Sequence, residues 1–249
     1  MCKPFHAGKA AQNGLLAARL AARGFTSRGD ILECPQGFAE THSADFSPAA
    51  ALELPPDGFH ILANLFKYHA ACYFTHAPIE CARKLREAHR IAPAAIVEVR
   101  LHIDAATDRV CNIASPADGL ESKFSLVQTV AMALAGIDTA SLGAWSESTA
   151  RDPHLVRLRQ SIAIEFQSGW PPTVAELEVI LADGRRVATR HDAGVAERDL
   201  AAQRERLCAK FDALVEPVLG APRSRELREM IGGLDEVADI GPLARLAAR

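Results

Sequence analysis

The stretch AIVEVRLHI, residues 95–103, decides the fold of this chain because its apolar and polar side chains alternate. In an extended chain the apolar residues share one face: Val97, Val99, Leu101 and Ile103. The polar residues share the other: Glu98, Arg100 and His102. Successive side chains of a β-strand point to opposite faces, so this period of two predicts a strand with one buried face.

Two further regions predict partners for this strand. Residues 161–166 alternate in the same way, through Ile162, Ile164 and Phe166. Residues 176–181 and 186–190 flank an Asp-Gly dipeptide at positions 183 and 184. Asp-Gly supplies the positive φ angles of a tight hairpin turn. The sequence therefore predicts a small, mainly antiparallel sheet.

Helical patterns lie on both sides of the predicted sheet. Apolar residues recur at helical spacing, or small residues dominate, in the segments 8–23, 34–44, 77–90, 121–135 and from 197 onward, with short helices near Arg225 and Pro242. Gly24 follows the first of these segments as a helix stop. Pro-Pro-Asp-Gly at 55–58 indicates a boundary. The apolar run 60–66 favours a strand.

This order of elements predicts an α+β fold, in which helical-domain segments flank a smaller α+β lid domain with a mainly antiparallel sheet. We expect residues 1–54 to end a helical domain and residues 55–196 to form the lid-like domain. We expect residues 197–249 to return to the helical domain.

Composition excludes several classes of protein. Hydrophobic residues make up 49% and charged residues 24%, as in folded globular chains, and the net charge of −3 provides no basic surface for nucleic acid. No apolar run reaches the roughly 18 residues that span a membrane, and the first residues of this sequence do not show the charged, apolar, small-residue order of a secretory signal. The six cysteines are scattered without a CxxC pair. We therefore expect reduced thiols in a cytoplasmic protein, with no metal site.

The opening KPFHAGKAAQ, residues 3–12, sets Lys3, His6 and Lys9 just before or at the start of a helix. The free N–H groups and the positive dipole end of a helix N-terminus attract anions. These residues could therefore hold a carboxylate. A solvated basic tail would show the same residues, so this segment alone leaves both interpretations open.

The segment KYHAACYFTH, residues 67–76, places His76 just ahead of a helix. Histidine can act as an acid or a base near neutral pH, so His76 is a candidate for proton transfer. The alternative is that His69 and His76 are packed or surface histidines.

The segment SKFSL, residues 122–126, opens another predicted helix. Lys123 and Ser125 could bind an anion there, or the serine could simply cap the helix. Signatures of other enzyme classes are missing from the chain: it has no GxSxG, no P-loop, no HExxH and no GxGxxG after a strand.

Three segments together resemble the MmgE/PrpD family, which includes 2-methylcitrate dehydratase and cis-aconitate decarboxylase. They are residues 3–14, 67–80 and 123–126, which occur in the family's order and spacing, and Gly24-Phe25-Thr26 fits the same pattern. The resemblance covers nearly the whole chain. It implies a helical domain with a smaller α+β lid, a homodimer, and no metal or organic cofactor.

The resemblance also implies roles for single residues. Lys3 matches the family's active-site lysine, which would hold a substrate carboxylate or stabilise an enolate-like charge. His76 matches the histidine of the family's Thr-His segment, which implies acid/base work. We expect substrate contacts from His6, Lys9, Lys123, Ser125 and Gln128. Gln128 departs from the tyrosine that relatives often carry, and a glutamine does not readily shuttle a proton.

Family chains are longer and carry the opening motif near their middle, after a helical region. We therefore expect Met1 to be an internal position of a longer protein, or the upstream half to be a separate chain. The leading expectation is a cofactor-independent lyase, a dehydratase or a decarboxylase, for a small di- or tricarboxylate. An isomerase or epimerase of the same family is the nearest alternative. A non-catalytic remnant that binds an acid or a partner is the third.

Overall fold

The computed structural model describes residues 2–56 and 58–248, with side chains from Phe5 onward. The chain divides into two compact units, Met1–His60 and Ile61–Arg249. Asp57, in the predicted Pro-Pro-Asp-Gly break, lies outside the described residues. The prediction of three domain segments therefore stays a prediction.

The α-helices described in the first unit are α1 (Cys2–Ala21), α2 (Phe38–His42) and α3 (Pro48–Leu52). The predicted first helix is confirmed, although it begins at Cys2 rather than Gly8. The predicted helix over 34–44 is shorter than expected, because a turn precedes α2. Gly37 lies in that turn, where an added Cβ would come within 2.6 Å of the Cys34 carbonyl oxygen.

The prediction of a strand over 60–66 is wrong. His60–Ala63 form a 3-10 helix, and the apolar side chains of the run are largely exposed. A continuous apolar run has no period that separates a strand from a helical turn, so the pattern could not distinguish between these two structures.

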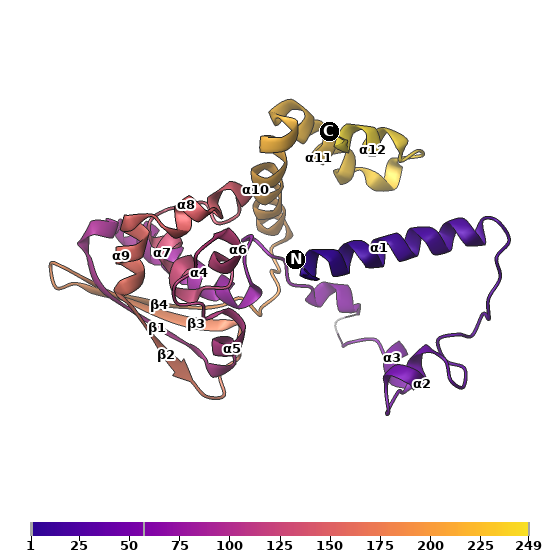
Figure 1. Ribbon diagram of the computed structural model, residues 1–249, viewed down its shortest axis with the longest axis horizontal. Coiled ribbons are helices and arrows are strands. Elements are labelled where there is room, and N and C mark those ends of the chain that lie inside the picture. The colour runs from indigo at the N-terminus through magenta and orange to yellow at the C-terminus, as the bar shows by residue number, and fades with distance from the viewer. Residues whose placement is uncertain (1, 57, 249) are drawn as a thin grey trace. The chain divides into compact units, whose positions relative to one another are not determined.

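The second unit is built on one sheet of four strands (Figure 1). The strands are β1 (Ile96–Asp104), β2 (Ile162–Gln167), β3 (Val174–Leu181) and β4 (Arg186–Asp192), in the order β2-β1-β3-β4. β1 runs parallel to β2 and antiparallel to β3, and β3 pairs antiparallel with β4. The α+β fold with a mainly antiparallel sheet is thus confirmed, as is the hairpin at Asp183-Gly184.

One detail of β1 differs from the prediction. Val97 is 59% exposed, whereas Ile96 is 3% exposed and joins the core. The register between β1 and β3 shifts between Ile96 and Glu98. Such a bulge reverses the alternation of faces at that point. From Val99 onward the predicted faces hold.

Helices cover one face of the sheet. α4 (His76–His89) packs on β3, β4 and α7 (Leu126–Leu134), and α9 (Pro153–Gln160) packs on α7 and β2. The core lies between these helices and the inward residues of the strands, which include Val99, Leu101, Leu177 and Val179. This core fixes the start of α4 beside the end of β4.

The predicted helix over 121–135 is interrupted. It consists of α6 (Gly119–Ser122) and α7, because Ser125 is extended (φ −122°, ψ 111°) and accepts a hydrogen bond from the Gln128 backbone N–H. The sequence analysis also failed to predict α8 (Glu147–Ala150) and α9. For α9, Asp152-Pro153 has the cap and first-turn proline typical of a helix start.

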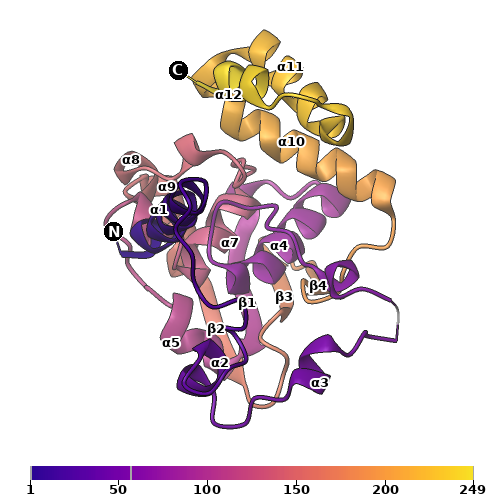
Figure 2. The ribbon, with the colours of Figure 1, turned by 90° about the vertical axis from the view of Figure 1, so that its right-hand side faces the viewer.

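The remaining elements are short connections and the helical end of the chain. They are α5 (Asp108–Cys111), the 3-10 helices Tyr73–Thr75, Pro93–Ala95, Ala105–Thr107, Leu142–Ala144 and Leu234–Glu236, and the helices α10 (Leu200–Leu219), α11 (Ala221–Gly232) and α12 (Gly241–Ala247). Figure 2 shows α11 and α12 beside α10, and all three belong to the same compact unit as the sheet. No helix in the described ranges is long and apolar enough to cross a membrane.

Candidate functional site

His76 stands at the first position of α4, directly after the 3-10 turn Tyr73–Thr75. The Thr75 hydroxyl donates to the Cys72 carbonyl at 2.7 Å, which closes this turn. The His76 ring stacks on the Tyr73 ring, with centroids 4.9 Å apart and planes at 26°. The edge of His69 meets it at 64°, again with centroids 4.9 Å apart. Two neighbouring rings therefore fix the plane of the His76 imidazole.

The buried His76 side chain lines a pocket of about 80 Å³. The polar walls of this pocket include Tyr73, Glu80, His191 and Arg206. Its volume is below the roughly 300–1,000 Å³ of a typical ligand pocket, so it has room for one functional group rather than a whole tricarboxylate. Within the described ranges, Nε2 of His76 has no hydrogen-bond partner. Buried polar atoms are nearly always paired, so this unpaired nitrogen is unusual and makes His76 a candidate functional residue.

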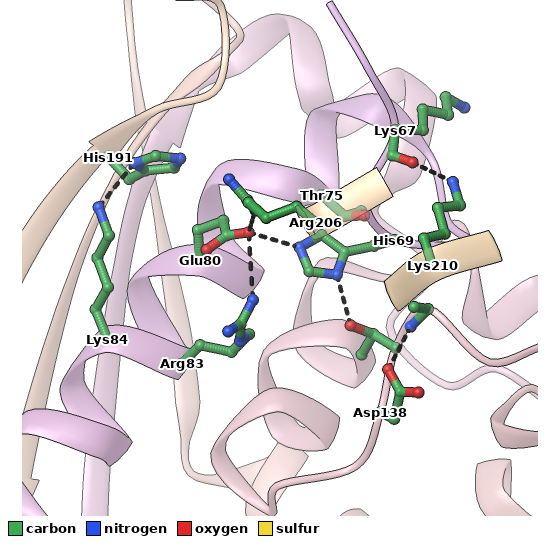
Figure 3. Close-up of polar contacts among 12 residues, drawn as sticks. Lys67, His69, Thr75, Glu80, Arg83, Lys84, Asp138, His191, Arg206 and Lys210 are labelled. Atoms are coloured by element: carbon green, nitrogen blue, oxygen red, sulfur yellow. Dashed lines mark hydrogen bonds and ion pairs between the residues drawn. The ribbon is translucent and has the colours of Figure 1, made fainter. Parts of the chain in front are cut away.

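His69, by contrast, is satisfied at both ring nitrogens. Nε2 lies 3.1 Å from Glu80 Oε1, and Nδ1 lies 2.7 Å from Thr139 Oγ1. An ionised carboxylate can only accept, so we assign the proton to Nε2 and let Nδ1 accept from the threonine hydroxyl. Figure 3 shows the Glu80 carboxylate between His69, Arg83 and Arg206.

These contacts set the charges in the site. Burial alone raises the pKa of Glu80, but the hydrogen bond from His69 and the attraction of Arg206 and Arg83 outweigh it, and the pKa falls to about 2. Burial, with the nearby His69 and Lys67 adding to it, lowers the pKa of His76 to about 3. Burial also lowers the pKa of His69, against the pull of Glu80. Both imidazoles are therefore neutral near pH 7.

Helix α10 contacts the segment around Lys67 and Tyr68, which precedes His76 in the sequence. The Arg206 guanidinium lies 3.6 Å from the centre of the Tyr68 ring and pairs with Glu80. Lys210 Nζ donates to the Lys67 carbonyl oxygen (Figure 3). The pocket residue Tyr73 donates its hydroxyl to the Ala193 carbonyl at 2.6 Å, just after β4. Segments far apart in the sequence thus meet around His76.

The predicted residues of the first unit lie on α1. His6 and Lys9 are exposed, and Lys9 Nζ donates to Gln12 Oε1 at 3.1 Å. The side chain of Lys3 lies outside the described residues. Roles for Lys3, His6 and Lys9 stay predictions.

Three predicted residues lie in the second unit but not on the walls of the His76 pocket. Ser125 caps α7. Gln128 is buried, and its Oε1 accepts from Arg159 Nη1 at 2.7 Å. Lys123 Nζ lies 6.0 Å from the centre of the Trp145 ring. Whether Lys123, Ser125 and Gln128 touch a substrate stays a prediction.

The sequence interpretation missed the residues that surround His76. Glu80 follows His76 by one helical turn, a spacing that could have indicated a shared face of α4. Arg206 lies 126 positions from Glu80, and nothing local indicates their pairing. In the described part of the chain, no three His, Cys, Asp or Glu residues gather closely enough to hold a metal ion.

Comparison with known proteins adds to this geometry. The MmgE/PrpD C-terminal domain matches residues 69–236, and the MmgE/PrpD N-terminal domain matches residues 1–51. Cis-aconitate decarboxylase of Homo sapiens is 24% identical over 254 residues, which cover 98% of this chain and 52% of that protein. The chain thus spans about half the length of this curated relative. The match to the C-terminal domain alone covers more than half of the chain, and the chain belongs to the MmgE/PrpD family.

Proposed function

We propose that this chain supplies part of the active site of a lyase, a dehydratase or a decarboxylase, for a small di- or tricarboxylate. One observation carries the proposal: the buried His76 lines a small pocket, and its Nε2 has no hydrogen-bond partner within the described ranges. The similarity to cis-aconitate decarboxylase supports the reaction class.

In this proposal His76 exchanges a proton with the substrate. Dehydration needs a base that takes a proton next to a carboxylate, and decarboxylation needs an acid that returns one to carbon. A neutral imidazole with a free nitrogen can do the first and, once protonated, the second. A bound carboxylate would raise the pKa of His76 from its low value, because a nearby negative charge favours the charged imidazole.

Lys3 is the second residue of the proposal, and its support is the family resemblance alone. A lysine beside a substrate carboxylate would offset the negative charge that develops as the proton leaves. His6, Lys9, Lys123, Ser125 and Gln128 remain the proposed substrate contacts. A metal or an organic cofactor has no part in these steps.

The test is turnover of cis-aconitate and citrate by the purified 249-residue chain, followed by NMR in deuterated water. We expect His76→Gln, which keeps hydrogen bonding but cannot carry a proton, to lower the rate by about 100-fold or more. Lys3→Ala should lower it to a similar extent. The matched control is His154→Gln, at an exposed histidine of the same unit, which should leave the rate unchanged.

Retention of most of the activity in His76→Gln would contradict the proposal. Exchange of the α-proton without release of a group would instead identify an isomerase or epimerase. Binding of the acids without turnover, both by the unaltered chain and after addition of the expected upstream half, would identify the non-catalytic alternative.

A further inference from the structure

His69 is a buried histidine that the proposed chemistry does not use. It is 3% exposed, and both ring nitrogens are occupied by Glu80 and Thr139. Its ring nevertheless meets the His76 ring edge-on, at a centroid distance of 4.9 Å. A buried ring with two hydrogen bonds cannot turn freely, so it forms a fixed wall against His76.

Burial is the main reason why the pKa of His69 is lowered and this wall stays neutral, and the charges around Glu80 assist it. A lone buried carboxylate would draw a proton onto His69 and make it a cation. Arg83, at 3.6 Å, and Arg206 share the same carboxylate oxygen and offset its charge. Glu80 therefore orients His69 without charging it. A positive His69 would repel a proton arriving on His76, so its neutrality matters for proton transfer.

Thr139 completes the arrangement at the other ring nitrogen. Its hydroxyl donates to Nδ1, so the two hydrogen bonds select one tautomer, with the proton on Nε2. The Thr139 backbone carbonyl accepts from the Ala70 N–H at 2.9 Å, next to His69 in the chain. Backbone and side chain together hold the threonine hydroxyl in place.

We propose that Glu80, Thr139 and His69 form a positioning chain that fixes the ring of His76, an inference that rests on the proposed role of His76 as the proton carrier. Arg206, which offsets the charge of Glu80, belongs to α10. The positioning chain is therefore complete only when α10 contacts α4. The C-terminal helices would then affect proton transfer although they do not supply the proton carrier.

The central test is Thr139→Val, which keeps the shape of the side chain and removes its hydroxyl. We expect kcat for cis-aconitate to fall about tenfold with little change in KM, because orientation rather than binding is lost. In the full chain labelled with ¹⁵N-histidine, His69 should keep its proton on Nε2, where Glu80 still accepts it, but the Nδ1 shift of His69 and the His76 nitrogen shifts should move. Thr139→Ser returns the hydroxyl and should rescue both readouts.

The matched control is Thr129→Val. Thr129 is also a buried threonine, and its hydroxyl donates to the Leu126 carbonyl at 3.0 Å within α7. We expect this variant to lose stability while kcat, the pH profile of kcat and the histidine shifts stay the same. Glu80→Gln is the second variant, for the case that Thr139→Val does not fold, and should move the same readouts as Thr139→Val.

The outcomes separate the two proposals. If His76→Gln abolishes turnover but Thr139→Val and Glu80→Gln leave kcat and the histidine nitrogen shifts unchanged, the positioning chain is wrong and the proposed function stands. If turnover survives in His76→Gln, the proposed function fails and the positioning role fails with it. If the chain shows no turnover, the NMR shifts decide, and unmoved His76 signals in Thr139→Val overturn the inference.

Discussion

The two compact units of this chain use apolar residues in different ways. In unit Met1–His60, the described side chains of α1 are all exposed, including Phe5 at 70% and Leu15 at 63%. In unit Ile61–Arg249, a continuous core joins the sheet to α4 and α7. The difference teaches that mutual burial holds the sheet and its helices together, whereas the described side chains of α1 have no such support within their own unit.

The largest expected effect comes from the same substitution made in each unit. Leu101→Ala removes a fully buried side chain from β1 and should lower the free energy of unfolding by about 2–5 kcal/mol. Leu16→Ala, at a side chain that is 56% exposed on α1, should change it by less than about 0.5 kcal/mol. Urea unfolding followed by circular dichroism measures both. Equal losses of stability in Leu101→Ala and Leu16→Ala would contradict this difference between the two units.

A smaller effect should appear on acidification, and it should arise in the second unit. The unfolded chain binds a proton at His76 below its ordinary pKa of 6.5, whereas the folded chain binds one only near pH 3. Stability is therefore lost as the pH falls between these values. Between pH 7 and pH 5 the free energy of unfolding should drop by about 2 kcal/mol from this group, and the lowered pKa of His69 should add to the loss.

His76→Gln should remove most of that pH dependence. His42→Gln, at an exposed histidine of the first unit, should leave it unchanged. Urea titrations of the three proteins at both pH values provide the measurement, and an unchanged slope in His76→Gln would show that the acid sensitivity lies elsewhere.

The smallest effect concerns helix caps. Asp152 accepts from the His154 N–H at 2.7 Å at the start of α9, which packs on the core, so Asp152→Ala should cost about 1 kcal/mol. Ser47 caps α3 in the first unit by accepting from the Ala50 N–H at 3.3 Å, and α3 has no buried residue. Ser47→Ala should therefore leave the main thermal unfolding transition unmoved. A shift as large as that of Asp152→Ala would indicate that α3 shares the cooperative core.

Much of the fold could be predicted because its signals are local. The alternation in residues 95–103, the Asp183-Gly184 turn and the spacing of α4 each depend on neighbours in the sequence. The prediction errors occur where the structure depends on contacts that neighbouring residues do not determine. The bulge at Val97 depends on pairing with β3, and the interruption of the helix at Ser125 depends on a choice between continuing and capping.

For the candidate site, the sequence by itself determined the position of His76 before a helix and, through the family resemblance, its candidate role. Only the tertiary structure decided its surroundings: the stacked Tyr73, the neutral His69 and the carboxylate of Glu80 shared with Arg206. The physical reason is that burial and charge pairing depend on distance in space. The ion pair between α4 and α10 joins Glu80 and Arg206, which are 126 positions apart. The sequence around neither residue indicates that the two residues pair.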